Sequence, residues 1–169
     1  MKDKPKKKKR SVKYAAIAVG VMIIGMSIFF VYSSEQAKMR GQAFGKTIEF
    51  VQEDLRKQTH TFDSKVSMFK DGNISKNEFL EYAKKHTNEM EKIILRYNNL
   101  QTPKQFIPSV ELFKLSAETQ LESEKYTIEW IKTDDDAAFV RSDSLWQQAV
   151  QYEQAALFEF NLVQRQANP

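Results

Sequence analysis

YAAIAVGVMIIGMSIFFVY, residues 14–32, runs for nineteen residues without a charged side chain. As a helix it would be roughly 28 Å long, close to the thickness of the hydrocarbon core of a bilayer. A helix that is apolar on every side has no polar face to turn towards water. The sequence therefore predicts a single transmembrane helix over 14–32. The residues expected to form this anchor are Tyr14, Ile17, Val21, Ile23, Ile24, Ile28, Phe29 and Phe30.

A basic tail, residues 1–13, precedes this stretch. It carries eight bases and one acid, whereas the remaining 156 residues carry 18 bases and 21 acids. Basic residues beside a transmembrane helix favour the cytoplasmic side. We therefore expect a single-pass protein of the cell membrane, with the tail in the cytoplasm and the bulk of the chain outside it. The residues expected to set this topology are Lys6, Lys7, Lys8, Lys9, Arg10 and Lys13.

The N-terminal region has two other possible interpretations, a cleaved signal peptide and a nucleic-acid-binding arm. A cleaved signal peptide usually has an apolar core of about 7–15 residues followed by an A-x-A-like site. The stretch 14–32 is longer and no A-x-A follows it, so we expect an uncleaved signal anchor. A lysine run can also be a nuclear-localisation or nucleic-acid-binding arm. Its place beside an apolar stretch, and the mildly acidic remainder of the chain, predict no nucleic-acid partner.

The rest of the chain has the pattern of amphipathic helices. Residues 33–46 are polar and are expected to form a juxtamembrane linker, and 47–169 an extracytoplasmic helical bundle. Short polar connections separate the predicted helices, and short connections force neighbouring helices to run antiparallel. The predicted fold is therefore all-α, with an antiparallel up-and-down four-helix bundle after the anchor. The four helices are expected at about 47–70, 75–100, 103–133 and 136–165.

Apolar residues spaced three and four apart mark the face that each helix should bury. The expected core positions are Phe44, Ile48, Val51, Leu55, Phe62, Val66 and Phe69 in the first stripe; Phe79, Ala83, His86, Met90, Ile93 or Ile94, Tyr97 and Leu100 in the second; Val110, Phe113, Ala117, Leu121, Ile128 and Ile131 in the third; and Phe139, Trp146, Val150, Leu157 and Phe160 in the fourth. Gln58 and Lys65 interrupt the first stripe. They are the polar residues that could lie inside the bundle, where a ligand site would need them.

Chemistry-bearing motifs are scarce. The chain has no cysteine, which excludes disulfides, thiolate catalysis and cysteine-ligated metals. The segment 71–79 is similar to the second half of a calcium loop, but Ser67 and Phe69 occupy positions where oxygen ligands are needed. A glycine turn followed by an S-x-x-E capping box explains the same residues without a metal. We expect no catalytic residues, no cofactor and no metal site, so the predicted protein is not an enzyme.

Aromatic residues gather in the C-terminal half. Phe158 and Phe160 are two positions apart, so their side chains diverge by about 200° around a helix and cannot share the centre of one face. One of them is expected either to be exposed or to belong to an unusually thick core. The residues proposed for contact with a partner are Trp130, Trp146, Phe158 and Phe160.

Three features of the layout point to a group of proteins: KKKKR before the anchor (6–10), the junction LQTP (100–103), and the spaced alanines of 136–154. With them the chain resembles the small membrane-anchored extracytoplasmic helical-bundle proteins of Gram-positive bacteria. The resemblance implies a surface-facing bundle in the cell envelope and assigns no functional residue. The favoured hypothesis is a non-enzymatic interaction module that binds an envelope or membrane protein, or itself, through a helix face. A binding protein for a small ligand, lipid or wall component, and a cytoplasm-facing regulator, stay as alternatives.

Overall fold

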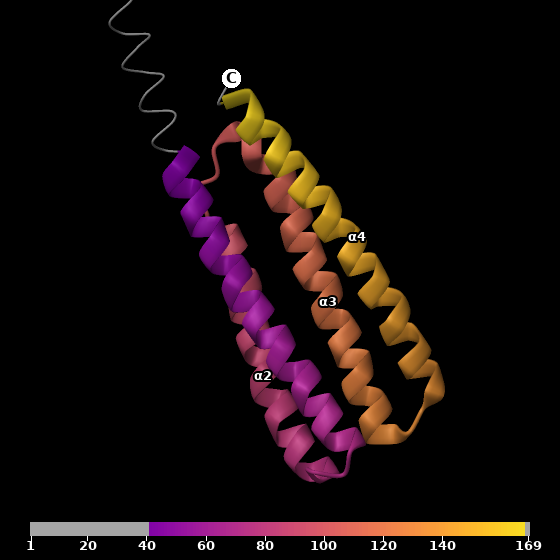
Figure 1. Cartoon of the computed structure of the whole chain (residues 1–169). Coiled ribbons are helices and arrows are strands. Elements are labelled where there is room, and N and C mark those ends of the chain that lie inside the picture. The colour runs from indigo at the N-terminus through magenta and orange to yellow at the C-terminus, as the bar shows by residue number, and fades with distance from the viewer. Residues whose placement is uncertain (1–40, 168–169) are drawn as a thin grey trace, which may run out of the picture. The chain divides into compact units, whose positions relative to one another are not determined.

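The described part of the chain is an all-helical bundle (Figure 1). The computed structural model describes residues 41–167. One helix covers 41–70, and the elements that follow are α2 (Lys76–Asn98), the 3-10 turn η1 (Lys104–Phe106), α3 (Ile107–Thr133) and α4 (Asp136–Ala167). No strand occurs in these residues, so the predicted all-α class and helical bundle are confirmed.

The predicted tail, anchor and most of the linker lie outside the described residues. This includes every residue named above for the anchor and for the topology. Within 41–167, every helix is either too short or too polar to cross a membrane.

Local hydrogen bonds explain where the helices begin and end. The capping box predicted before α2 is present: the backbone N–H of Glu78 donates to Ser75 Oγ at 3.3 Å, and the backbone N–H of Ser75 donates to the Glu78 carboxylate at 2.7 Å. Gly72 has a φ of 73°, a conformation that favours glycine, and it closes the turn before this cap. At the other connection, Asp135 Oδ1 accepts from the backbone N–H of Ala137 at 3.0 Å and so caps α4.

The first helix begins earlier than the sequence predicts. Residues 41–46, assigned above to the linker, are helical. The reason is that Phe44 continues the apolar stripe of Ile48, and its buried ring lies 5.1 Å from the ring of Phe106. Burial of this ring favours helix at a segment whose glycines alone would weaken it.

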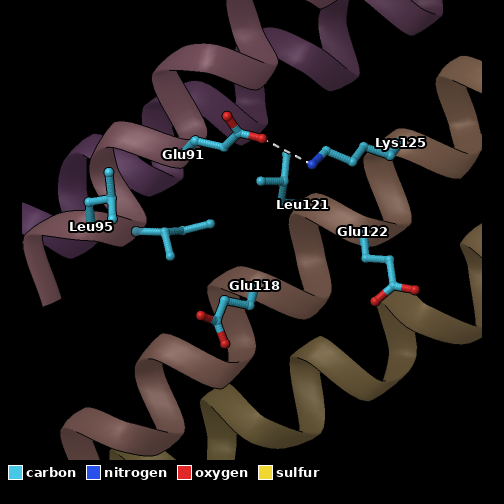
Figure 2. A pocket seen from close by; sticks show the side chains of 7 residues that line it. Glu91, Leu95, Glu118, Leu121, Glu122 and Lys125 are labelled. Atoms are coloured by element: carbon cyan, nitrogen blue, oxygen red, sulfur yellow. Dashed lines mark hydrogen bonds and ion pairs between the residues drawn. The ribbon is translucent and has the colours of Figure 1, made fainter. Parts of the chain in front are cut away.

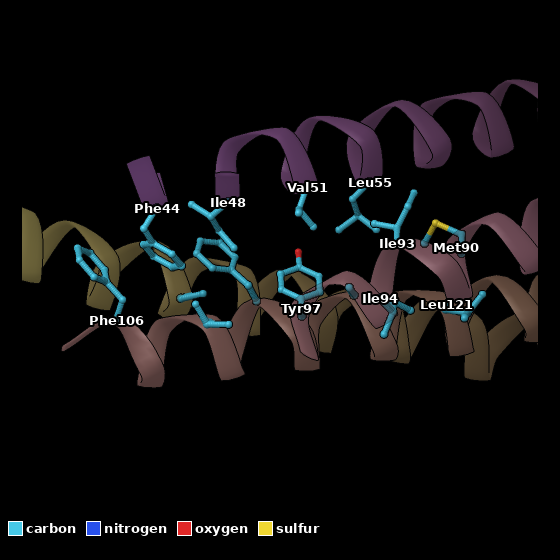
Figure 3. Packing of buried hydrophobic residues seen from close by; sticks show 14 residues of the cluster. Phe44, Ile48, Val51, Leu55, Met90, Ile93, Ile94, Tyr97, Phe106 and Leu121 are labelled. Carbon is cyan, nitrogen blue, oxygen red and sulfur yellow. The ribbon is translucent and has the colours of Figure 1, made fainter. Parts of the chain in front are cut away.

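The apolar core falls into two clusters along the bundle. The larger lies towards the end that holds Phe44, here called the Phe44 end (Figure 3). Its buried members are Phe44, Ile48, Val51, Leu55, Met90, Ile93, Ile94, Tyr97, Phe106, Val110, Phe113, Ala117, Leu121 and Ala156. The smaller lies towards the turn at Gly72, the Gly72 end, and consists of Phe62, Phe79, Ala83 and Ile131.

Helix α4 packs on α3 through small residues. Its buried positions are Ala138, Ser142, Leu145, Ala149 and Ala156. Opposite them, Ser116 Oγ donates to the backbone carbonyl of Ala149, and Ser123 Oγ to that of Ser142, both at 2.8 Å. A side chain can reach the backbone of a neighbouring helix only where the two helices approach closely.

The predicted inward stripe of α4 was therefore wrong. Phe139, Trp146 and Leu157 are 41–45 % exposed, and of the five predicted residues only Phe160 packs against the larger core cluster. The large apolar residues follow a helical period, but the positions that touch α3 need small side chains. Alanine and serine produce little hydropathy contrast, so the strongest apolar period of α4 lies on the side that flanks its contact with α3.

Candidate functional site

A buried polar layer separates the two apolar clusters. His86 Nε2 donates to Glu124 Oε2 at 2.8 Å, and Gln120 Nε2 donates to Glu124 Oε1 at 3.1 Å. Gln120 also donates to Thr59 Oγ1 on the first helix. Three helices thus contribute to one connected layer, and His86, Gln120 and Glu124 are each at most 7 % exposed.

Aromatic side chains pack around the His86 ring. Phe62 stacks on it at 4.7 Å between ring centroids, and the Tyr82 hydroxyl lies at hydrogen-bonding distance from Nδ1, 3.5 Å away. Burial raises the pKa of Tyr82 to about 12, and the charges of Glu124 and Asp63 add to the shift. Burial also raises the pKa of Asp63, with Glu124 contributing, while His60 and His86 oppose the shift.

The polar layer links three helices of the bundle through side-chain hydrogen bonds. Among the described residues no buried side-chain nitrogen or oxygen lacks a hydrogen-bond partner. The same part of the chain contains no cluster of three or more His, Asp or Glu side chains placed to hold a metal ion. Each buried nitrogen and oxygen of the layer therefore has at least one hydrogen-bond partner within the bundle.

The sequence contains a signal for this layer, in gaps of the apolar stripes that polar residues fill. In the third stripe Leu121 is followed by Ile128, and the intervening helical position three residues after Leu121 is Glu124. In the first stripe the gap between Leu55 and Phe62 contains Thr59. His86 was placed on the second stripe as a core or interface residue, and it is buried. Of the two polar residues expected to point inwards, Gln58 and Lys65, neither belongs to the layer.

An open groove of about 590 Å³ lies between α2 and α3 (Figure 2). Ile94 and Leu121 form its apolar floor, and Leu95, which is 57 % exposed, forms part of the α2 side. Glu91 on α2 and Lys125 on α3 form an ion pair of 3.0 Å across it. The groove therefore offers a hydrophobic surface bordered by charged side chains, and it lies over the larger core cluster.

Carboxylates dominate the rim of this groove. Glu118 and Glu122 line its α3 side. Lys114 Nζ lies 3.6 Å from Glu118 Oε1, whereas Glu122 makes no ion pair within 41–167. An apolar floor with acidic edges suits an amphipathic ligand that carries positive charge. The lining residues include no histidine, serine or cysteine that could act as a nucleophile or base.

The exposed aromatic side of α4 is the third candidate. Phe139, Trp146, Val150 and Leu157 are spaced by seven, four and seven residues, so they lie on one side of the helix. That side flanks the small residues that pack on α3. Several large apolar groups in line on an exposed helix mark a surface suited to contact with another molecule.

The four residues proposed for partner contact fall into two classes. Trp130 and Phe160 are partly buried and pack within the bundle. The Trp130 ring lies 5.0 Å from that of Phe139, with Lys70 Nζ 5.3 Å from its centroid, and the Phe160 ring lies 5.1 Å from that of Phe106. Trp146 and Phe158 are exposed, at 41 % and 66 %. The structure therefore leaves two of the four available to a partner.

Comparison with known proteins gave no relative. No protein-family model matches this chain, and no curated protein and no solved structure is significantly similar to it.

Proposed function

We propose that this chain is a membrane-anchored, non-enzymatic interaction module of the cell envelope. In this proposal residues 14–32 anchor the chain in the membrane, the basic tail lies in the cytoplasm, and the bundle lies outside it. The bundle binds another envelope or membrane protein, or a second copy of itself, through a helix face. The support for the anchor is the uncharged stretch and the lysines before it.

The observation that carries the interaction role is the inverted arrangement of α4. Its buried face uses alanine, serine and one leucine, while Phe139, Trp146 and Leu157 stay partly exposed. A partner that covers these three groups would gain free energy, since each fully buried large apolar side chain contributes roughly 1.5–3 kcal/mol. A large apolar group kept on the outside favours a partner that covers it.

The interaction role is tested by site-specific photo-crosslinking in the cells that produce the protein. A photoreactive phenylalanine analogue at Trp146 is expected to give a discrete cross-linked product, because a partner covers this side. The matched control is Ser144, which is exposed on the same helix but does not belong to the apolar stripe. Equal, diffuse labelling from both positions, with no product of defined mass, would contradict the proposal.

The topology is tested through the absence of cysteine. A single Asn73→Cys substitution in the exposed turn between the first helix and α2 can be labelled in intact cells by a membrane-impermeant thiol reagent. Labelling of membrane-retained protein is expected. Labelling only after lysis would place the bundle in the cytoplasm and favour the regulator instead.

The α2–α3 groove favours a second candidate function, a binding protein for a small ligand, lipid or wall component. Its apolar floor and carboxylate rim suit an amphipathic cation. Thermal unfolding with and without alkyl ammonium probes tests this: binding should raise the Tm of the parent chain and raise it less in a Leu95→Ser variant. Unchanged Tm values with every probe would exclude this class of ligand.

A further inference from the structure

The outward face of α4 is apolar only at its two ends. Seven residues spaced three or four apart lie on this face, which points away from the core: Val140, Ser144, Gln147, Gln151, Gln154, Phe158 and Leu162. The middle of the face is serine and glutamine. Phe158 and Leu162, at the Phe44 end, are 66 % and 42 % exposed. An aromatic side chain two-thirds exposed on an otherwise polar face is not explained by packing within the bundle.

A second exposed phenylalanine lies at the same height on the neighbouring helix. The Cβ position of Gly45 lies 4.0 Å from Gln164 Nε2, and the rings of Phe44 and Phe160 are 6.5 Å apart, so the first helix and α4 are side by side here. Because the two helices are antiparallel, these two contacts place Phe50 level with residues 154–159 of α4, the stretch that contains Phe158. Phe50 is 63 % exposed.

Two bases lie between this apolar group and the end of the bundle. Lys46 is one turn closer to the end than Phe50, and Arg165 is two turns closer than Phe158. Both are exposed, and neither makes an ion pair within 41–167. Apolar and aromatic groups with bases on one side are the composition that proteins place at the interface between acyl chains and head groups.

We propose that Phe50, Phe158 and Leu162, here called the lipid patch, rest on the surface of the bilayer, with Lys46 and Arg165 reaching the lipid phosphates. This inference rests on the membrane anchor of the proposed function. Eight residues, 33–40, separate the end of the anchor from the first described helix, and even fully extended they span at most about 29 Å. The Phe44 end is therefore the end that the chain holds close to the membrane.

Lipid contact fits this patch better than a protein partner does. Phe158 and Leu162 are one turn apart on α4, and Phe50 belongs to the first helix, so the three apolar groups form a small patch rather than a long stripe that could seat a partner helix. Single aromatic side chains can each insert into the interface without such a groove, while the long stems of Lys and Arg keep their charges at the head groups. With this face on the membrane, the α2–α3 groove lies on the opposite pair of helices.

The test uses the full chain in vesicles of phosphatidylcholine and phosphatidylglycerol. Because the chain has no cysteine, a nitroxide can be attached at one position through Phe158→Cys or Phe50→Cys. The matched control is Val140→Cys, which lies on the same outward face at the Gly72 end and is 67 % exposed. The readout is collision of the nitroxide with oxygen, which concentrates in lipid, relative to collision with a water-soluble nickel chelate present on both sides.

At Phe158 and Phe50 the oxygen-to-nickel collision ratio is expected to exceed that at Val140 at least threefold. Equal, water-like ratios at the three positions would overturn the lipid contact. A label at Phe158 shielded from both reagents would also overturn it, in favour of protein. Flotation of the vesicles distinguishes a failure of the lipid patch from a failure of the membrane anchor. A chain that does not float contradicts the proposed function itself. A floating chain with water-like labels contradicts only the lipid patch.

Discussion

At the scale of single residues, His86 and Glu124 form the buried pair whose disruption should lower the free energy of unfolding the most. Both side chains are almost fully removed from water, and the carboxylate accepts from His86 and from Gln120. Their mutual attraction offsets the cost of dehydrating them only while both are present. The pair therefore contributes little net stability as a unit, but each member depends strongly on the other.

We expect Glu124→Ala to lower the free energy of unfolding by about 3 kcal/mol, because it strands two buried donors and leaves a cavity. Urea unfolding followed by circular dichroism measures this. Glu129→Ala is the control, since Glu129 is exposed on the same helix and its contact with Lys132 is 3.8 Å long. That control should change stability by less than about 0.5 kcal/mol. Equal effects of the two substitutions would mean that the polar layer is not formed.

The raised pKa values of two tyrosines lead us to expect that the folded chain loses stability in alkali. Burial raises the pKa of Tyr82 to about 12, and burial together with the charge of Glu153 raises that of Tyr97 even further, against Arg96 and the hydrogen bond from Gln52. Both phenols hold their protons more tightly in the folded chain than in the unfolded chain, where the pKa is near 10. Their stabilising effect is complete below about pH 10 and is lost as the pH rises through the folded pKa.

The measurement is Tm as a function of pH between about 8 and 11.5, a range that begins below the ordinary tyrosine pKa. The parent should lose stability steeply above about pH 10. Tyr97→Phe should start from a lower Tm, since Gln52 Nε2 donates to the Tyr97 hydroxyl at 2.7 Å, but should lose less on the alkaline side. Identical slopes in parent and variant would show that Tyr97 is not protected from water.

At the scale of whole elements, the first three helices and α4 differ in how well sequence predicts them. In the first three, the apolar stripe and the buried face coincide, because Phe44, Met90 and Phe113 all fill the wide interior of the bundle. In α4 the partner is close, so the buried face is built from small residues. Hydropathy identifies an apolar side but not which of two sides faces a neighbour, and it is weakest where alanine and serine form the contact.

The polar layer could not be predicted from the sequence for a related reason. A glutamate inside a helix is usually exposed, and only its position in the gap between Leu121 and Ile128 distinguishes Glu124 from its neighbours. Whether the gaps of several helices meet depends on how the helices align along the bundle. That alignment is a tertiary property: it brings Thr59, His86 and Glu124 to one level although no local pattern relates them.

The close contact of α3 and α4 gives a direct prediction. Ala149 is 2 % exposed and its carbonyl accepts from Ser116. Ala149→Leu should force the helices apart and lower the free energy of unfolding by about 2–3 kcal/mol, since a leucine finds no space there. Gln147→Leu adds the same side chain at an exposed position of the same helix and should be nearly neutral. Thermal unfolding of the two variants decides: a neutral Ala149→Leu would mean that α4 is loosely packed.

At the scale of the molecule, residues 43–169 form one compact unit by themselves. Both apolar clusters lie within this unit, so the bundle should not need the first 40 residues to fold. A fragment that starts at Gly41 is therefore expected to be highly helical and to unfold cooperatively. Its three lipid-patch residues are 42–66 % exposed, so the apolar area that they can bury in a membrane is smaller than that of one saturated acyl chain, and one such chain gives only marginal binding.

This difference predicts how the two forms divide between water and lipid. The fragment should stay in the aqueous fraction on flotation with vesicles of phosphatidylcholine and phosphatidylglycerol, while the full chain floats, because stable retention needs the apolar stretch 14–32. Circular dichroism of the same samples checks that the fragment is folded. Flotation of the folded fragment would show that the bundle binds membranes without its anchor, and a full chain left in the aqueous fraction would remove the anchor. An unfolded fragment would instead show that the helices depend on the first 40 residues for their stability.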